Sequence, residues 1–98
     1  MKEKYKKYLP IGSVVILEGA SKRIMITGFA VKSKEDKENR LFDYVGCLYP
    51  EGVINTDKNL LFNHDQINRI YAIGYSDEEE KEFKEKLNKA LEEELNKE

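Results

Sequence analysis

Few residues in this 98-residue chain are of types that carry out chemistry. His64 is the only histidine and stands beside Asp65, and Cys47 is the only cysteine. A Cys–His pair could support nucleophilic catalysis, but that chemistry also needs an oriented base and an oxyanion-binding group, for which the sequence contains no motif. We therefore expect His64 and Asp65 to form a turn, and Cys47 to act as a small apolar residue inside a strand.

Metal and nucleotide sites are not expected either. A structural zinc site takes three or four converging ligands, and one histidine with one cysteine does not supply them. The six glycines are spread singly and form neither a dinucleotide-binding pattern nor a P-loop. The sequence thus predicts no catalytic residue, no metal and no cofactor.

Size and composition describe a single domain with a thin core. Hydrophobic residues make up 40% of the chain and charged residues 37%, and a chain of this length is too short for two separate cores. We expect residues 1–98 to form one domain, with a lead-in at 1–8, a β-sheet body at 9–75 and a helix at 76–97. A core this small also allows weak self-association.

Charge divides the chain into two parts. Residues 1–75 carry 12 Lys and Arg against 9 Asp and Glu, whereas residues 76–98 carry 5 against 10. An acidic tail repels phosphate, and the body has no dense basic cluster, so nucleic acid is not the expected partner. The sequence shows neither a signal-peptide pattern nor a run of about 20 apolar residues that could insert into a membrane, so we expect a cytoplasmic protein.

The sequence of the body predicts five strands. Strand-forming, largely β-branched or aromatic runs occupy residues 13–17, 23–32, 40–49, 60–62 and 67–73. Gly28 and Gly46 interrupt two of these runs, and a lone glycine within a strand usually marks a bulge or a sharp bend. The expected fold class is α+β: a small curved antiparallel sheet, or an SH3-like partial barrel, of about five strands followed by one C-terminal amphipathic helix.

The final segment changes to a helical period. Ser76 and Glu79 have the spacing of a capping box, which places the helix start at Ser76. One apolar stripe then follows, and its distal residues are Leu91 and Leu95. Because a 22-residue helix is about 33 Å long, we expect Leu91 and Leu95 to project beyond the body and to contact a partner.

Several strings of residues carry a family resemblance. They are Leu9-Pro10-Ile11-Gly12-Ser13-Val14-Val15, Met25-Ile26-Thr27-Gly28-Phe29, the stretch at residues 42–52 that contains DYVGCLYPEG, and the LFNHDQI stretch at 61–67. Together they resemble a small domain-of-unknown-function family of Firmicutes, number four-one-seven-six. The resemblance covers about residues 8–90.

The resemblance implies a protein-binding function. Members of this family are typically encoded beside type VII secretion genes and their LXG toxins. It therefore implies a non-enzymatic cytosolic accessory protein that binds an LXG-type toxin and acts as its chaperone or targeting adaptor. An immunity protein, or a small-barrel module that binds RNA or a ligand, is the alternative.

Polar residues in two strings are the other candidates for a protein-binding surface. Asp43 and Tyr44 lie in the third expected strand, and Asn63, His64 and Asp65 lie in the turn before the last one. If these polar groups cluster in space, a purely structural role for all of them would be unusual. We expect them, with Leu91 and Leu95, to form the contact surface.

Overall fold

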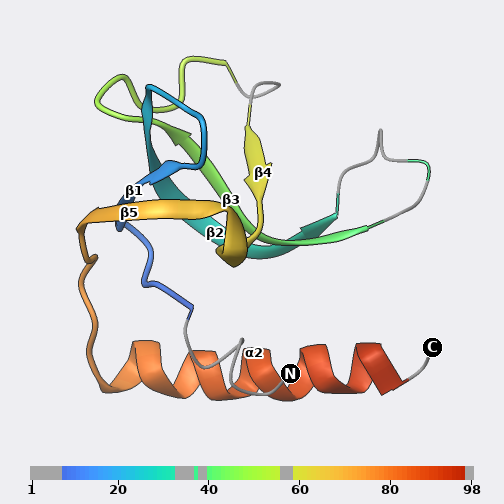
Figure 1. Ribbon diagram of the computed structural model, residues 1–98. Helices are drawn as coiled ribbons and strands as arrows, with labels where there is room; N and C mark the ends of the chain where they lie inside the picture. The colour runs from blue at the N-terminus through green and yellow to red at the C-terminus, as the bar shows by residue number, and fades with distance from the viewer. Residues whose placement is uncertain (1–7, 33–36, 38–39, 56–58, 97–98) are drawn as a thin grey trace.

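The computed structural model describes residues 8–32, 37, 40–55 and 59–96, and in the C-terminal helix it describes the side chains up to Leu91. Five strands are followed by one helix (Figure 1). This arrangement confirms the expected fold class. The elements are β1 (Val14–Leu17), β2 (Arg23–Lys32), β3 (Leu41–Leu48), β4 (Leu60–Phe62), the 3₁₀ turn η1 (His64–Gln66), β5 (Ile67–Ala72) and α2 (Glu78–Asn96).

The five strands form one open antiparallel sheet in the order β4-β3-β2-β1-β5. The strands β1 to β4 follow each other across the sheet as in a meander, but β5 crosses over to pair with β1. Both β4 and β5 are therefore edge strands, and β5 is exposed along nearly all of its length. The crossover brings the residues just before α2 next to those just before β1.

The expected bulge at Gly28 is present. The register between β2 and β3 shifts between Ile26 and Gly28, and a Cβ atom at Gly28 would lie 2.8 Å from the Val45 side chain. Gly46 is packed as closely, because a Cβ there would lie 2.7 Å from the carbonyl oxygen of Met25. Both glycines thus let neighbouring strands approach where the sheet curves.

The helix begins later than the capping-box pattern predicts. Its first residue is Glu78, and the backbone N–H of Glu80 donates to the Asp77 carboxylate at 3.0 Å. Asp77 is therefore the N-cap, and the prediction that Ser76 takes this role is wrong. The Ser76 hydroxyl instead donates to the Glu80 carboxylate at 2.6 Å.

The core lies between one face of the sheet and α2, which runs beneath the sheet in Figure 1. Leu91 is 4% exposed and belongs to this core, so the prediction that it projects beyond the body is wrong. The helix has 19 residues, or about 28 Å, whereas the ten residues of β2 extend about 33 Å. The open sheet is therefore long enough, along β2, to cover the length of the helix. The side chain of Leu95 lies outside the described part of the chain.

Candidate functional site

A cluster of hydrogen-bonded polar residues joins three distant parts of the chain. The Tyr8 hydroxyl donates to one oxygen of the Asp43 carboxylate at 3.0 Å, and the backbone N–H of His64 donates to the other at 2.8 Å. The Asp43 backbone N–H donates in turn to the Asn63 side chain at 3.0 Å. We call these residues, together with Tyr44, the polar cluster.

Tyr44 is at the centre of this cluster. Its side chain is fully buried. Its phenol oxygen accepts the Leu9 backbone N–H at 3.1 Å and lies 2.6 Å from Nδ1 of His64. The pKa of Tyr44 is raised to about 12, mainly by burial; the Leu9 hydrogen bond lowers this pKa and the nearby Asp43 carboxylate raises it.

The contact between Tyr44 and His64 joins the buried phenol to η1. A phenol with a pKa of about 12 keeps its proton near neutral pH, and the tautomer of the histidine decides which of the two groups donates in this contact. The imidazole is thus held in one orientation by the core.

The structure brings the predicted polar residues together, but it buries two of them. Asp43 and Tyr44 are buried, Asn63 and His64 are partly exposed, and Asp65 is exposed. The hydrogen bonds of the buried pair fix the N-terminal segment and η1 onto β3. A role of Asn63, His64 and Asp65 in partner contact stays a prediction, and Asp43 and Tyr44 serve the fold.

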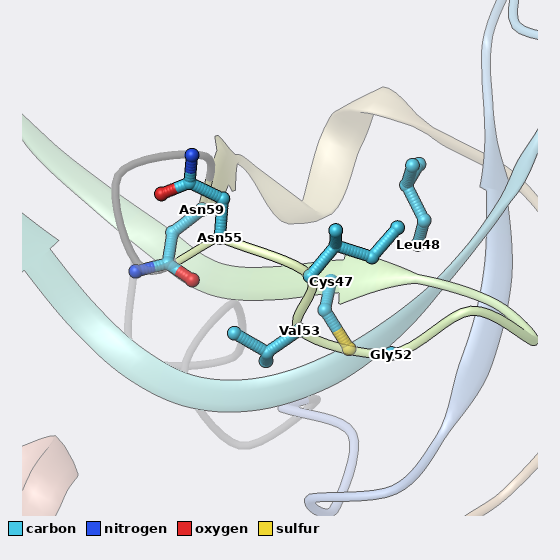
Figure 2. Close-up of a pocket in the computed structure, with 7 residues that line it drawn as sticks. Cys47, Leu48, Gly52, Val53, Asn55 and Asn59 are labelled. Atoms are coloured by element: carbon cyan, nitrogen blue, oxygen red, sulfur yellow. The ribbon is translucent and has the colours of Figure 1, made fainter.

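Cys47 is a buried free thiol, as expected. It lies three residues after Tyr44 in β3, so the two side chains point to opposite faces of the sheet. It lines a hollow of about 280 Å³ beneath the loop that follows β3, and Figure 2 shows its sulfur directed toward Gly52 and Val53. Among the described residues, no group of three or more His, Cys, Asp and Glu could hold a metal ion.

The surface that the sequence reasoning missed is an apolar hollow at the start of α2. It has a volume of about 430 Å³. Four apolar side chains line it, and three carboxylates of the first helical turn and its cap form the acidic rim: Ile11, Phe29, Tyr75 and Phe83, with Asp77, Glu79 and Glu80. We call this set the apolar hollow.

The side chains of the apolar hollow are unusually exposed for their type. Tyr75 is 80% exposed, Ile11 53% and Phe83 50%, while Phe29 anchors the floor, with its ring centroid 6.0 Å from that of Phe83. The signal in the sequence was Tyr75, a large aromatic residue in the short connection between the last strand and the helix, for which the sequence analysis predicts no role.

Two of the acidic side chains in the rim are already engaged. Asp77 caps the helix, and Glu80 pairs with Lys84 at 2.8 Å. Glu79 and its neighbour Glu78 are exposed. Glu79 of the rim and the adjacent Glu78 therefore present exposed carboxylates beside the apolar floor.

No helix in the described part of the chain is long and apolar enough to span a membrane.

Comparisons with known proteins give one match. Neither the curated proteins nor the solved structures include a match to this chain. The model of the family described as domain of unknown function DUF4176 matches residues 8–83, which is well over half of the chain. The chain therefore belongs to the DUF4176 family.

Proposed function

We propose that this protein is a non-enzymatic cytoplasmic accessory protein that binds an LXG-type toxin of the type VII secretion system as its chaperone or targeting adaptor. The observation that carries the binding function is the apolar hollow. The choice of toxin is supported by the resemblance described above. The proposal assigns the hollow to an amphipathic helix of the toxin.

The shape and chemistry of the hollow support a peptide segment as its occupant. A volume of about 430 Å³ accommodates one or two large side chains. Tyr75 and Phe83 present aromatic surface, which is common at the energetic centre of protein interfaces. A helix that inserts apolar side chains between them would bury this area from water.

The acidic rim supports a basic flank on the same segment. Glu78 and Glu79 lie at the N-terminal end of α2 and are exposed. Lys or Arg residues beside the inserted side chains would face these carboxylates, which favours the correct partner and speeds the encounter. The proposed ligand is therefore an amphipathic helix with basic residues beside its apolar stripe.

The placement of the reactive groups supports a non-enzymatic role. Nδ1 of His64 is directed at the Tyr44 hydroxyl, on the face of the sheet opposite to Cys47. The thiol and the imidazole therefore do not form the pair that nucleophilic catalysis by cysteine requires.

An immunity protein is the second candidate. The exposed acidic side of α2, which includes Glu82 and Glu85, favours it, because an acidic surface suits the basic active site of a nuclease toxin. Both candidates predict a complex with the toxin.

Two assays separate the candidates. Co-expression of tagged protein with an LXG-type toxin from the same genome should give a complex that co-purifies, and the Tyr75→Glu, Phe83→Glu variant should lose it. Ile54→Glu is the matched control, because Ile54 is 75% exposed but lines the other hollow. Protection of cells from the toxin by the protein would favour the immunity role. Repeated failure of the wild type to co-purify with any such toxin would contradict the proposal.

A further inference from the structure

Two arginines and two tyrosines alternate in a row on the exposed surface. The Arg23 guanidinium lies 5.1 Å from the ring centroid of Tyr49 and 5.5 Å from that of Tyr71. The Arg69 guanidinium lies 5.0 Å from the Tyr71 centroid. We call Tyr49, Arg23, Tyr71 and Arg69 the Arg–Tyr row.

The register of the sheet places this row on the face away from α2. Ile16 pairs with Arg23 on one side and with Arg69 on the other, so the two arginines flank it on three adjacent strands. Val15, the residue before Ile16, is fully buried in the core between the sheet and α2. Because successive side chains of a strand alternate, Ile16 and the two arginines point to the opposite side of the sheet. The row is thus separate from the apolar hollow.

Neither arginine of the row has a carboxylate partner in the part of the chain that the structure describes. The nearby cation Lys22 does have one, since its ammonium group lies 2.7 Å from Glu51. Arg23 and Arg69 both lie over the Tyr71 ring, so the two cations are neighbours on the surface. Acidic groups of a ligand would offset the repulsion between them.

Cation–π contacts also prepare the two guanidinium groups for an anion. A guanidinium that stacks on a ring keeps its N–H donors at the edge of its plane, and these donors match the two oxygens of a carboxylate. The rings restrict the side chains of Arg23 and Arg69, so less conformational entropy is lost when a ligand binds. The row is therefore a preorganised pair of anion receptors.

We propose that the Arg–Tyr row binds an acidic segment of a protein, with one carboxylate on Arg23 and a second on Arg69. The ring of Tyr71 already has two guanidinium groups over it and that of Tyr49 has one. These guanidinium groups compete for the ring faces on which the bases of single-stranded nucleic acids stack. A row with only two cations, neither of which has a carboxylate partner among the described residues, in a chain of net charge −2, also suits a short acidic segment better than a polyanion.

The test uses the full chain and fluorescence anisotropy at low salt. The probe is a fluorescein-labelled peptide of alternating Glu and Gly, with a Gln and Gly peptide as the uncharged comparison. The test variant is Arg23→Gln with Arg69→Gln, both at exposed positions. The matched control is Arg40→Gln, which removes the same charge from an arginine that also lies over a ring, that of Phe42 at 5.7 Å. A second variant, Arg23→Lys with Arg69→Lys, keeps the charge but loses the planar fork, so it tests the site if the first variant folds poorly.

The wild type and Arg40→Gln should bind the Glu peptide with similar affinity and should bind the Gln peptide at least ~10-fold more weakly. The double Gln variant should lose ~10-fold or more in affinity for the Glu peptide, and the double Lys variant should lose part of that. Undiminished binding by both double variants, or an equal loss in Arg40→Gln, would overturn the proposal. Tighter binding of a single-stranded oligouridine than of the Glu peptide would also overturn it and would assign the row to nucleic acid.

Discussion

The phenol oxygen of Tyr44 lies 2.6 Å from Nδ1 of His64, and this contact connects the core to the turn before the last strand. The same oxygen accepts the backbone N–H of Leu9. One buried side chain therefore holds the N-terminal segment, β3 and η1 together. Removal of the Tyr44 hydroxyl should weaken the contacts that hold all three segments together.

Tyr44→Phe should destabilise the fold by about 1 to 3 kcal/mol near neutral pH, because the Leu9 N–H and His64 Nδ1 lose their partner in a buried place. Chemical denaturation monitored by circular dichroism measures this change. Tyr75→Phe is the control, since Tyr75 is 80% exposed, and it should change stability by less than about 0.5 kcal/mol. Equal stability of the two variants would contradict the role of Tyr44.

The raised pKa of Tyr44 predicts a loss of stability in alkali. The pKa rises from 10.0 in the unfolded chain to about 12 in the fold, so below pH ~10 both states hold the proton and this contribution is fully present. Between these values the unfolded state loses the proton first. The free energy of unfolding should then fall by up to about 1.4 kcal/mol per pH unit. Denaturation curves collected across this range should show a shallower fall in Tyr44→Phe than in the wild type, and parallel curves would contradict the assignment.

Asp43→Ala should destabilise the fold by about 2 to 4 kcal/mol, because the Tyr8 hydroxyl and the His64 N–H both donate to its carboxylate. Thermal denaturation of the variant measures the effect. Asp65→Ala is the control, since Asp65 carries the same group on the exposed side of the turn. A similar small shift in both melting temperatures would show that the polar cluster contributes little.

Leu91→Ala should destabilise the fold by about 2 to 5 kcal/mol, as expected for a leucine that is 4% exposed. Lys89→Ala, at an exposed position of the same helix, should have little effect. Chemical denaturation of both variants tests this. An unchanged midpoint for Leu91→Ala would mean that the C-terminal half of α2 is not part of the core.

Gly74→Ala should be more costly than Gly19→Ala. A Cβ at Gly74 would overlap the backbone carbonyl of Ile11, whereas Gly19 has open space around it and only a positive φ of 76°. The strained φ costs about 1 kcal/mol, and the backbone clash at Gly74 forces the connection before α2 away from Ile11. Comparison of the two melting temperatures measures the difference, and an equal or smaller loss for Gly74→Ala would contradict the close approach.

Local patterns in the sequence predicted the strands and the bulge at Gly28, because β-branched runs and a lone glycine act over a few residues. The pairing of β5 with β1 depends on contacts between residues that are distant in the sequence. It therefore cannot be predicted from the residue pattern within one strand. That pairing creates the apolar hollow, since it brings Ile11 next to the segment of Tyr75, and it also places Arg69 near Arg23. Neither surface could be predicted from spacing alone.

The burial of Leu91 was missed for a related reason. The stripe on the helix was recognised, but the width of the surface that covers it depends on whether the sheet closes or stays open. The start of the helix was misplaced because Asp77 and Ser76 are both good N-caps, and the local pattern does not choose between them.

The most direct test of the central claim is a calorimetric titration of an LXG-type toxin from the same genome with the wild type, the Tyr75→Glu, Phe83→Glu variant and Ile54→Glu. We expect the wild type and Ile54→Glu to bind with the same affinity. The double variant should bind at least ~10-fold more weakly while it keeps its circular dichroism spectrum, because a tenfold loss corresponds to about 1.4 kcal/mol, less than the value of one buried aromatic side chain. Wild-type affinity in a folded Tyr75→Glu, Phe83→Glu variant would contradict the assignment of the apolar hollow as the binding site.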